Sequence, residues 1–63
     1  MQQDNLRRIV RLAKANNEDI SYKDFAEYID ISVNSLYNWL SGGFKLSYQK
    51  AKQLEDIAIN LID

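Results

Sequence analysis

Apolar residues recur three and four positions apart along four stretches of this chain, which is the spacing of an amphipathic α-helix. The predicted helices cover about residues 5–15, 22–29, 33–41 and 48–62. No stretch alternates apolar and polar residues for long enough to predict a strand. The pattern therefore predicts a compact all-α domain of four helices, forming a single unit over residues 1–63.

Residue types that commonly cap helices agree with these boundaries. A residue of this kind precedes each predicted helix: Asp4, Ser21, Ser32 and Ser47. Asp24 follows Ser21 by three positions, which is the spacing of a capping box. The adjacent glycines Gly42 and Gly43 end the third helix.

The apolar stripes predict which side chains meet in the core. The expected buried residues are Leu6, Ile9, Val10, Ala13, Phe25, Ala26, Ile29, Leu36, Trp39, Leu40, Ala51, Leu54, Ala58, Leu61 and Ile62. Ile57 lies at the edge of the last stripe and Ile59 lies outside it. Four apolar residues near the end of the chain exceed what one stripe needs, and they are a candidate dimer surface: Ile57, Ile59, Leu61 and Ile62. The alternative is that they cover the open end of the core.

The amino-acid composition excludes several kinds of binding site and catalysis. The 63 residues include no Cys and no His, which excludes disulfides, the usual zinc sites, and catalysis by a thiolate or an imidazole. So short a chain barely closes one core, so we expect no enzyme activity, no metal and no cofactor. No apolar run approaches the roughly 20 residues that span a bilayer, and no signal-peptide pattern is present. We therefore expect a cytoplasmic protein without a membrane partner.

The net charge of −1 hides an uneven distribution. Residues 5–17 carry four bases and no acid, residues 18–44 carry five acids and one base, and residues 45–52 carry three lysines and no acid. Blocks of this kind either place a basic face on a nearly neutral molecule or are ordinary solvated helix faces. The bases of the first block are further candidates for binding phosphate: Arg7, Arg8, Arg11 and Lys14.

Residues 22–41 combine a short helix, a three-residue break and a second short helix. Ala26 is small enough to let the two helices cross closely, while Ile29 and Ile31 bracket the break. Leu36 and Trp39 bury one face of the second helix and leave its other face polar. This is the pattern of a helix-turn-helix, with bounds of about 21–42.

The segment resembles the helix-turn-helix of the lambda-repressor-like family, which includes phage repressors, Cro proteins and xenobiotic-response-element-type regulators. The residues that carry the resemblance are Ser21, Phe25, Ala26, Ile29, Asp30, Ile31, Ser32, Leu36, Trp39 and Gly42. The chain departs from the family pattern in having Asp30 at the usual turn glycine and Tyr22 at the usual glutamine. The family's fifth helix also has no counterpart in this sequence.

The resemblance implies sequence-specific binding of double-stranded DNA, with residues 33–41 as the recognition helix. The implied base contacts are Ser32, Val33, Asn34, Tyr37, Asn38 and Ser41. Asn bonds bidentately to adenine and Val packs on a thymine methyl, whereas no Arg or Lys lies between Ser32 and Ser41 to read guanine. The expected half-site therefore leans toward A·T pairs. The expected phosphate contacts are Tyr22, Lys45, Ser47, Tyr48 and Lys50.

One recognition helix makes few base contacts, so we expect a homodimer on a palindromic operator, acting as a transcriptional repressor or regulator of phage or mobile-element type. Two alternatives stay open. The first is a protein-interaction module, such as an anti-repressor or small phage inhibitor, which uses the fold without DNA. The second is the DNA-binding portion of a larger recombinase or transposase.

Overall fold

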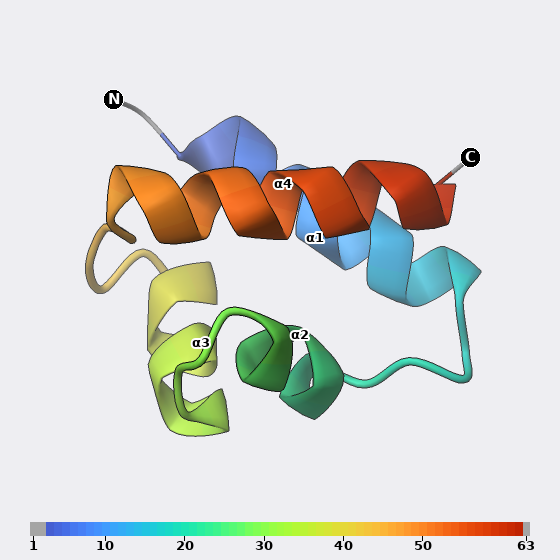
Figure 1. Cartoon of the computed structure of the whole chain (residues 1–63), viewed down its shortest axis with the longest axis horizontal. Helices are drawn as coiled ribbons and strands as arrows, with labels where there is room; N and C mark the ends of the chain where they lie inside the picture. The colour runs from blue at the N-terminus through green and yellow to red at the C-terminus, as the bar shows by residue number, and fades with distance from the viewer. Residues whose placement is uncertain (1–2, 63) are drawn as a thin grey trace.

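Four helices account for most of the chain that the computed structural model describes, residues 3–62 (Figure 1). They are α1 (Asp4–Asn16), α2 (Tyr22–Tyr28), α3 (Val33–Leu40) and α4 (Tyr48–Ile62). These residues contain no strand, and they form a compact body measuring 26 × 21 × 19 Å. The all-α prediction is therefore confirmed. None of the described helices has the length and apolar character needed to cross a bilayer.

The predicted serine caps are present at three helix beginnings. Ser21 and Asp24 form the capping box, since the Asp24 N–H donates to Ser21 Oγ (3.3 Å) and the Ser21 N–H donates to Asp24 Oδ2 (2.9 Å). Ser32 Oγ accepts from the Ser35 N–H, and Ser47 Oγ accepts from the N–H three residues later. Each bond satisfies an amide that has no partner within its own helix.

The prediction that Asp4 caps the first helix is wrong. The helix begins at Asp4, and Gln3 occupies the cap position without a side-chain bond to the first-turn amides. The Asp4 carboxylate instead lies in the first turn, where the helix dipole favours negative charge, and it accepts from Arg7 at 2.9 Å. The Gln3 side chain is buried and bonds with Trp39 and Leu46, so it does not cap the helix.

The helices form two layers (Figure 1). The long helices α1 and α4 make one layer and run side by side in the same direction, and the short helices α2 and α3 make the other. Hydrogen bonds tie the two long helices at both ends. Gln3 Nε2 donates to Leu46 O just before α4 (2.9 Å), and Asn17 Nδ2 donates to Leu61 O near its end (2.8 Å).

The core lies between these layers. Its buried apolar side chains come from all four helices and from two connecting segments: Leu6, Val10, Ala13, Phe25, Ala26, Ile29, Leu36, Trp39, Leu40, Leu46, Ala51, Leu54 and Ala58. All except Leu46 follow from the apolar periodicity. Ile9, Leu61 and Ile62 were predicted to be buried and are only partly so, because they pack at the margin of the core.

The connection between α2 and α3 turns at Asp30, whose φ is +61°. A positive φ is uncommon for residues other than glycine, and Asp is one of the few that tolerate it. The Ile31 N–H then donates back to Ala26 O at 2.9 Å, which closes the turn against α2.

Candidate nucleic-acid interface

Helix α3 has two chemically different sides. Its apolar side chains are buried: Leu36, Trp39 and Leu40. Asn34, Asn38 and the C-cap residue Ser41 are exposed. At the beginning of the helix Ser32 is exposed and Val33 is half-buried. Five of the six predicted base-contact residues, Tyr37 included, are thus exposed on α3 or at its ends.

Tyr37 belongs partly to the exposed side and partly to the contact between α2 and α3. It is 51% exposed, and its ring meets the half-buried Tyr22 ring edge-on, with centroids 5.8 Å apart. Such an arrangement of two rings is favourable. The contact fixes the direction of the Tyr37 ring at the flank of the polar side. It also draws the Tyr22 ring toward the domain rather than leaving it free for a phosphate.

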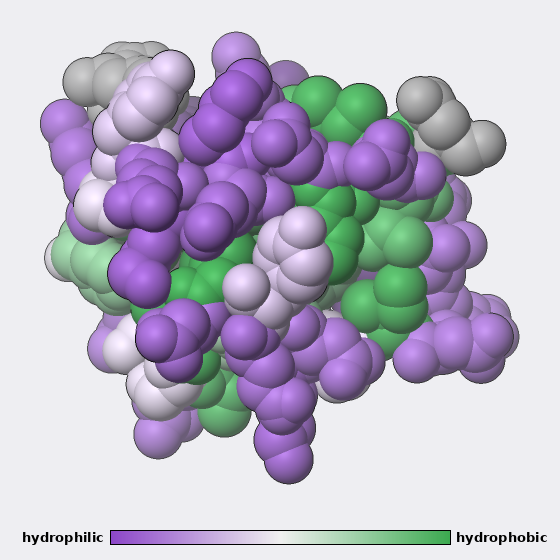
Figure 2. Space-filling view, in the orientation of Figure 1, coloured by the Kyte–Doolittle hydropathy of each residue, from purple (hydrophilic) through white to green (hydrophobic). Residues whose placement is uncertain are grey.

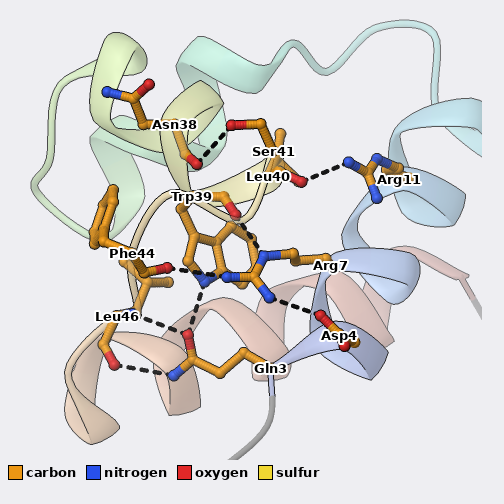
Figure 3. A network of polar contacts seen from close by, with 10 residues as sticks. All are labelled: Gln3, Asp4, Arg7, Arg11, Asn38, Trp39, Leu40, Ser41, Phe44 and Leu46. Atoms are coloured by element: carbon orange, nitrogen blue, oxygen red, sulfur yellow. Dashed lines mark hydrogen bonds and ion pairs between the residues drawn. The ribbon is translucent and has the colours of Figure 1, made fainter.

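The buried end of α3 is held by one glutamine (Figure 3). Gln3 Oε1 accepts from the Trp39 indole N–H at 2.7 Å and from the Leu46 N–H at 2.9 Å. Gln3 Nε2 donates to Leu46 O, so the amide uses both of its ends. A buried indole N–H needs such a partner. The sequence showed that Trp39 is buried, but the partner 36 positions earlier carried no signal in the pattern.

Two arginines of α1 bind the C-terminal end of α3 (Figure 3). Arg7 donates from Nε to Trp39 O and from a terminal nitrogen to Phe44 O (2.9 Å), and its guanidinium carbon lies 5.1 Å from the Trp39 ring centroid. Arg11 donates to Leu40 O at 2.6 Å. The last carbonyls of a helix lack partners within it and carry partial negative charge, so cations stabilise this end. These bonds occupy two of the four bases of α1 that were candidates for binding phosphate.

The candidates for phosphate contact after α3 fall into two groups. Lys45, Ser47 and Tyr48 are exposed in and after the segment that joins α3 to α4. Lys50 is half-buried, and its Nζ donates to Ile29 O, the C-cap carbonyl of α2, at 2.8 Å. Its charge therefore stabilises the end of α2, and among these four candidates the accessible basic charge is that of Lys45.

The four candidate dimer residues differ in how far they are buried. Ile57, Leu61 and Ile62 are partly buried against the core, whereas Ile59 is 42% exposed. Three of the four thus lie where the alternative interpretation expects them, over the open end of the core.

The described residues bring no three His, Cys, Asp or Glu side chains together in a way that would hold a metal ion. Their most distinctive exposed feature is the polar side of α3. Compared with models of protein families, with curated proteins and with solved structures, the chain matches none of them. What this surface does is therefore inferred from its residues.

Proposed function

We propose that this chain binds double-stranded DNA in a sequence-specific way, with α2 and α3 as a helix-turn-helix and α3 as the helix that enters the major groove. The observation that carries the proposal is the two-sided character of α3. Its apolar side is wholly committed to the core, while Asn34 and Asn38 project from the other side without a structural task for their side-chain amides. Exposed amides on a rigidly held helix suit the donor and acceptor edges of bases.

The bonds around α3 support the same proposal. Contacts to bases require a helix that does not move relative to the domain, because a loosely held side chain loses entropy on binding. Gln3, Arg7 and Arg11 hold the C-terminal end of α3, and the Asp30 turn holds its beginning. The polar side chains of α3 therefore project from a helix that is bonded to the rest of the domain at both of its ends.

In the proposed complex Asn34 and Asn38 read adenine, Val33 packs on a thymine methyl, and Lys45, Ser47 and Tyr48 contact phosphates. The site leans toward A·T pairs because residues 32–41 contain no Arg or Lys. Two copies on a palindromic site would occlude a promoter or operator, so regulation of phage or mobile-element type fits best.

Binding-site selection from random duplexes, followed by Asn34→Ala and Asn38→Ala, tests the proposal. Each substitution is expected to lower affinity for the selected site about 5- to 150-fold, the equivalent of about 1–3 kcal/mol for a bidentate contact. Asn60→Ala, the same change at an exposed position of α4, is the matched control and should leave binding unchanged. A G-rich selected half-site would refute base recognition by α3. Equal losses of DNA affinity in all three variants would refute it as well.

A protein-interaction module is the second candidate, and one observation favours it. Arg7, Arg11 and Lys50 donate to backbone carbonyls, so fewer cations remain for phosphates than the sequence suggested. A gel-shift titration with random duplex DNA at low salt separates the two functions. Retardation whose log affinity falls with log salt at a slope near −0.9 per phosphate contact supports DNA binding. No retardation at micromolar protein supports the interaction module.

A further inference from the structure

Basic charge of α1 gathers in a hollow between this helix and the C-terminal end of α3. One side of the hollow is lined by three bases and one acid of α1: Arg7, Arg8, Arg11 and Asp4. These residues follow one another at spacings that place them on one face of the helix. The other side is lined by residues 40–42, at the end of α3. The side chains of the lining carry a net charge of +2, so the hollow suits an anion.

Two of the three arginines keep hydrogen-bond donors available for a partner outside the domain. Arg8 and Arg11 are exposed, and no hydrogen bond or ion pair among residues 3–62 involves Arg8. Arg11 donates to Leu40 O from one terminal nitrogen, and a guanidinium has five N–H groups. Arg7 differs, because all three of its side-chain nitrogens donate to acceptors of the domain itself. The accessible cations of the hollow are therefore Arg8 and Arg11.

The polar side of α3 runs directly into this hollow. Asn34, Asn38 and Ser41 are four and three positions apart, which places them on one side of the helix, and Ser41 also lines the hollow. Ser41 Oγ donates to Asn38 O at 2.9 Å, and the neighbouring Leu40 O accepts from Arg11 (Figure 3). The surface proposed to read bases and the hollow with its arginines are thus continuous through Ser41.

The dimensions of a duplex place phosphates at this end of α3. Eight residues at about 1.5 Å each make a helix about 12 Å long, which is about the width of the major groove. A recognition helix contacts bases with its N-terminal residues, so its C-terminal end lies nearer the sugar–phosphate backbone that borders the groove. Phosphate oxygens accept bidentate hydrogen bonds from a guanidinium, which makes arginine a suitable partner.

We propose that Arg8 and Arg11 bind a backbone phosphate of the same duplex that α3 reads. The inference rests on the proposed function, because it requires α3 to lie in the major groove. Arg7 positions the end of α3 and does not bind the phosphate itself. Its bonds to Trp39 O and Phe44 O, with that of Arg11 to Leu40 O, offset the partial negative charge that would otherwise repel a phosphate there.

The salt dependence of DNA binding tests the role of Arg8. Fluorescence anisotropy with a labelled duplex gives the affinity of the whole chain at several salt concentrations. Arg8→Gln is expected to lower affinity about fivefold at low salt, for the selected site and for random duplex alike, because a phosphate carries no sequence information. The slope of log affinity against log salt should become shallower by about 0.9. Arg8→Lys keeps the charge and should keep the wild-type slope.

Asn60→Asp is the matched control, since it changes the net charge by the same amount at an exposed position of α4. This residue lies in the last turn of α4, at the side of the domain away from α3, where hydrophobic atoms reach the surface (Figures 1 and 2). The control should leave the slope unchanged. If Arg8→Gln also leaves it unchanged while Asn34→Ala and Asn38→Ala weaken binding, α3 reads DNA but the hollow binds no phosphate. A wild-type chain that binds no duplex at all would overturn the proposed function and this inference together.

Neutral phosphate analogues locate the contact on the DNA. A single methylphosphonate, which removes the charge of one phosphate, is placed in turn at each position flanking the selected half-site. At one or two positions the wild-type chain should lose affinity about fivefold, whereas Arg8→Gln, which lacks the contact already, should lose little. An equal response of the two proteins at every position would show that Arg8 contacts no phosphate, and it would overturn the proposal.

Discussion

Replacing Gln3 by Met removes the amide that joins α1, α3 and the segment before α4 while keeping a side chain of similar length. Gln3 is 4% exposed and makes three bonds, two as acceptor and one as donor. In Gln3→Met the Trp39 indole N–H, the Leu46 N–H and the Leu46 carbonyl lose their partners at once. Within residues 3–62 of the wild-type protein, every buried side-chain N or O atom has a hydrogen-bond partner, so Gln3→Met introduces a cost that the wild-type protein does not carry.

The magnitude follows from the cost of an unsatisfied buried group, about 1–3 kcal/mol each. Met regains part of this by packing, and it removes the desolvation cost of the amide itself. We therefore expect the free energy of unfolding to fall by about 2–4 kcal/mol. At about 0.05–0.15 kcal/mol per residue, a chain of this length has only about 3–9 kcal/mol to lose. The midpoint of thermal unfolding should fall by at least about 10 °C.

Urea unfolding followed by tryptophan fluorescence measures this directly, because Trp39 is the single tryptophan and lies beside the substituted residue. Asn5→Met is the control, since it places the same side chain at an exposed position in the first turn of α1. A difference of less than about 0.5 kcal/mol between the free energies of unfolding of the two variants would refute this reasoning. It would mean that water replaces the Gln3 bonds without loss of stability.

Two further changes test the turn and the cap. At Asp30, where φ is +61°, Gly avoids the steric cost of a Cβ that Ala cannot avoid, so Asp30→Gly should be about 1 kcal/mol more stable than Asp30→Ala in thermal unfolding. Equal stabilities would contradict the positive φ. Ser21→Ala removes the side chain that caps α2 and should cost about 1 kcal/mol in urea unfolding, whereas Ser21→Gly should cost only a few tenths. The opposite ranking would show that the capping box does not stabilise α2.

The sequence did not predict which basic residues of α1 bind the end of α3. Arg7, Arg8, Arg11 and Lys14 form one basic block, and periodicity assigns them to faces other than the apolar one. Nothing in the spacing distinguishes Arg7 and Arg11, which bind the carbonyl end of α3, from their neighbour Arg8. The distinction depends on where the end of α3 lies relative to α1, and that position is set by packing between residues about 30 positions apart.

The sequence by itself determined the four helices, most of the core and the serine caps. These features depend on periodicity and on the preferences of single residues, which act over a few neighbouring positions. Tertiary structure alone decided that Gln3 is buried, that Lys50 binds Ile29 O, and that Arg7 and Arg11 bind carbonyls at the end of α3. Such features arise when distant segments meet, because a polar group enclosed by packing must find its partner wherever the fold brings one.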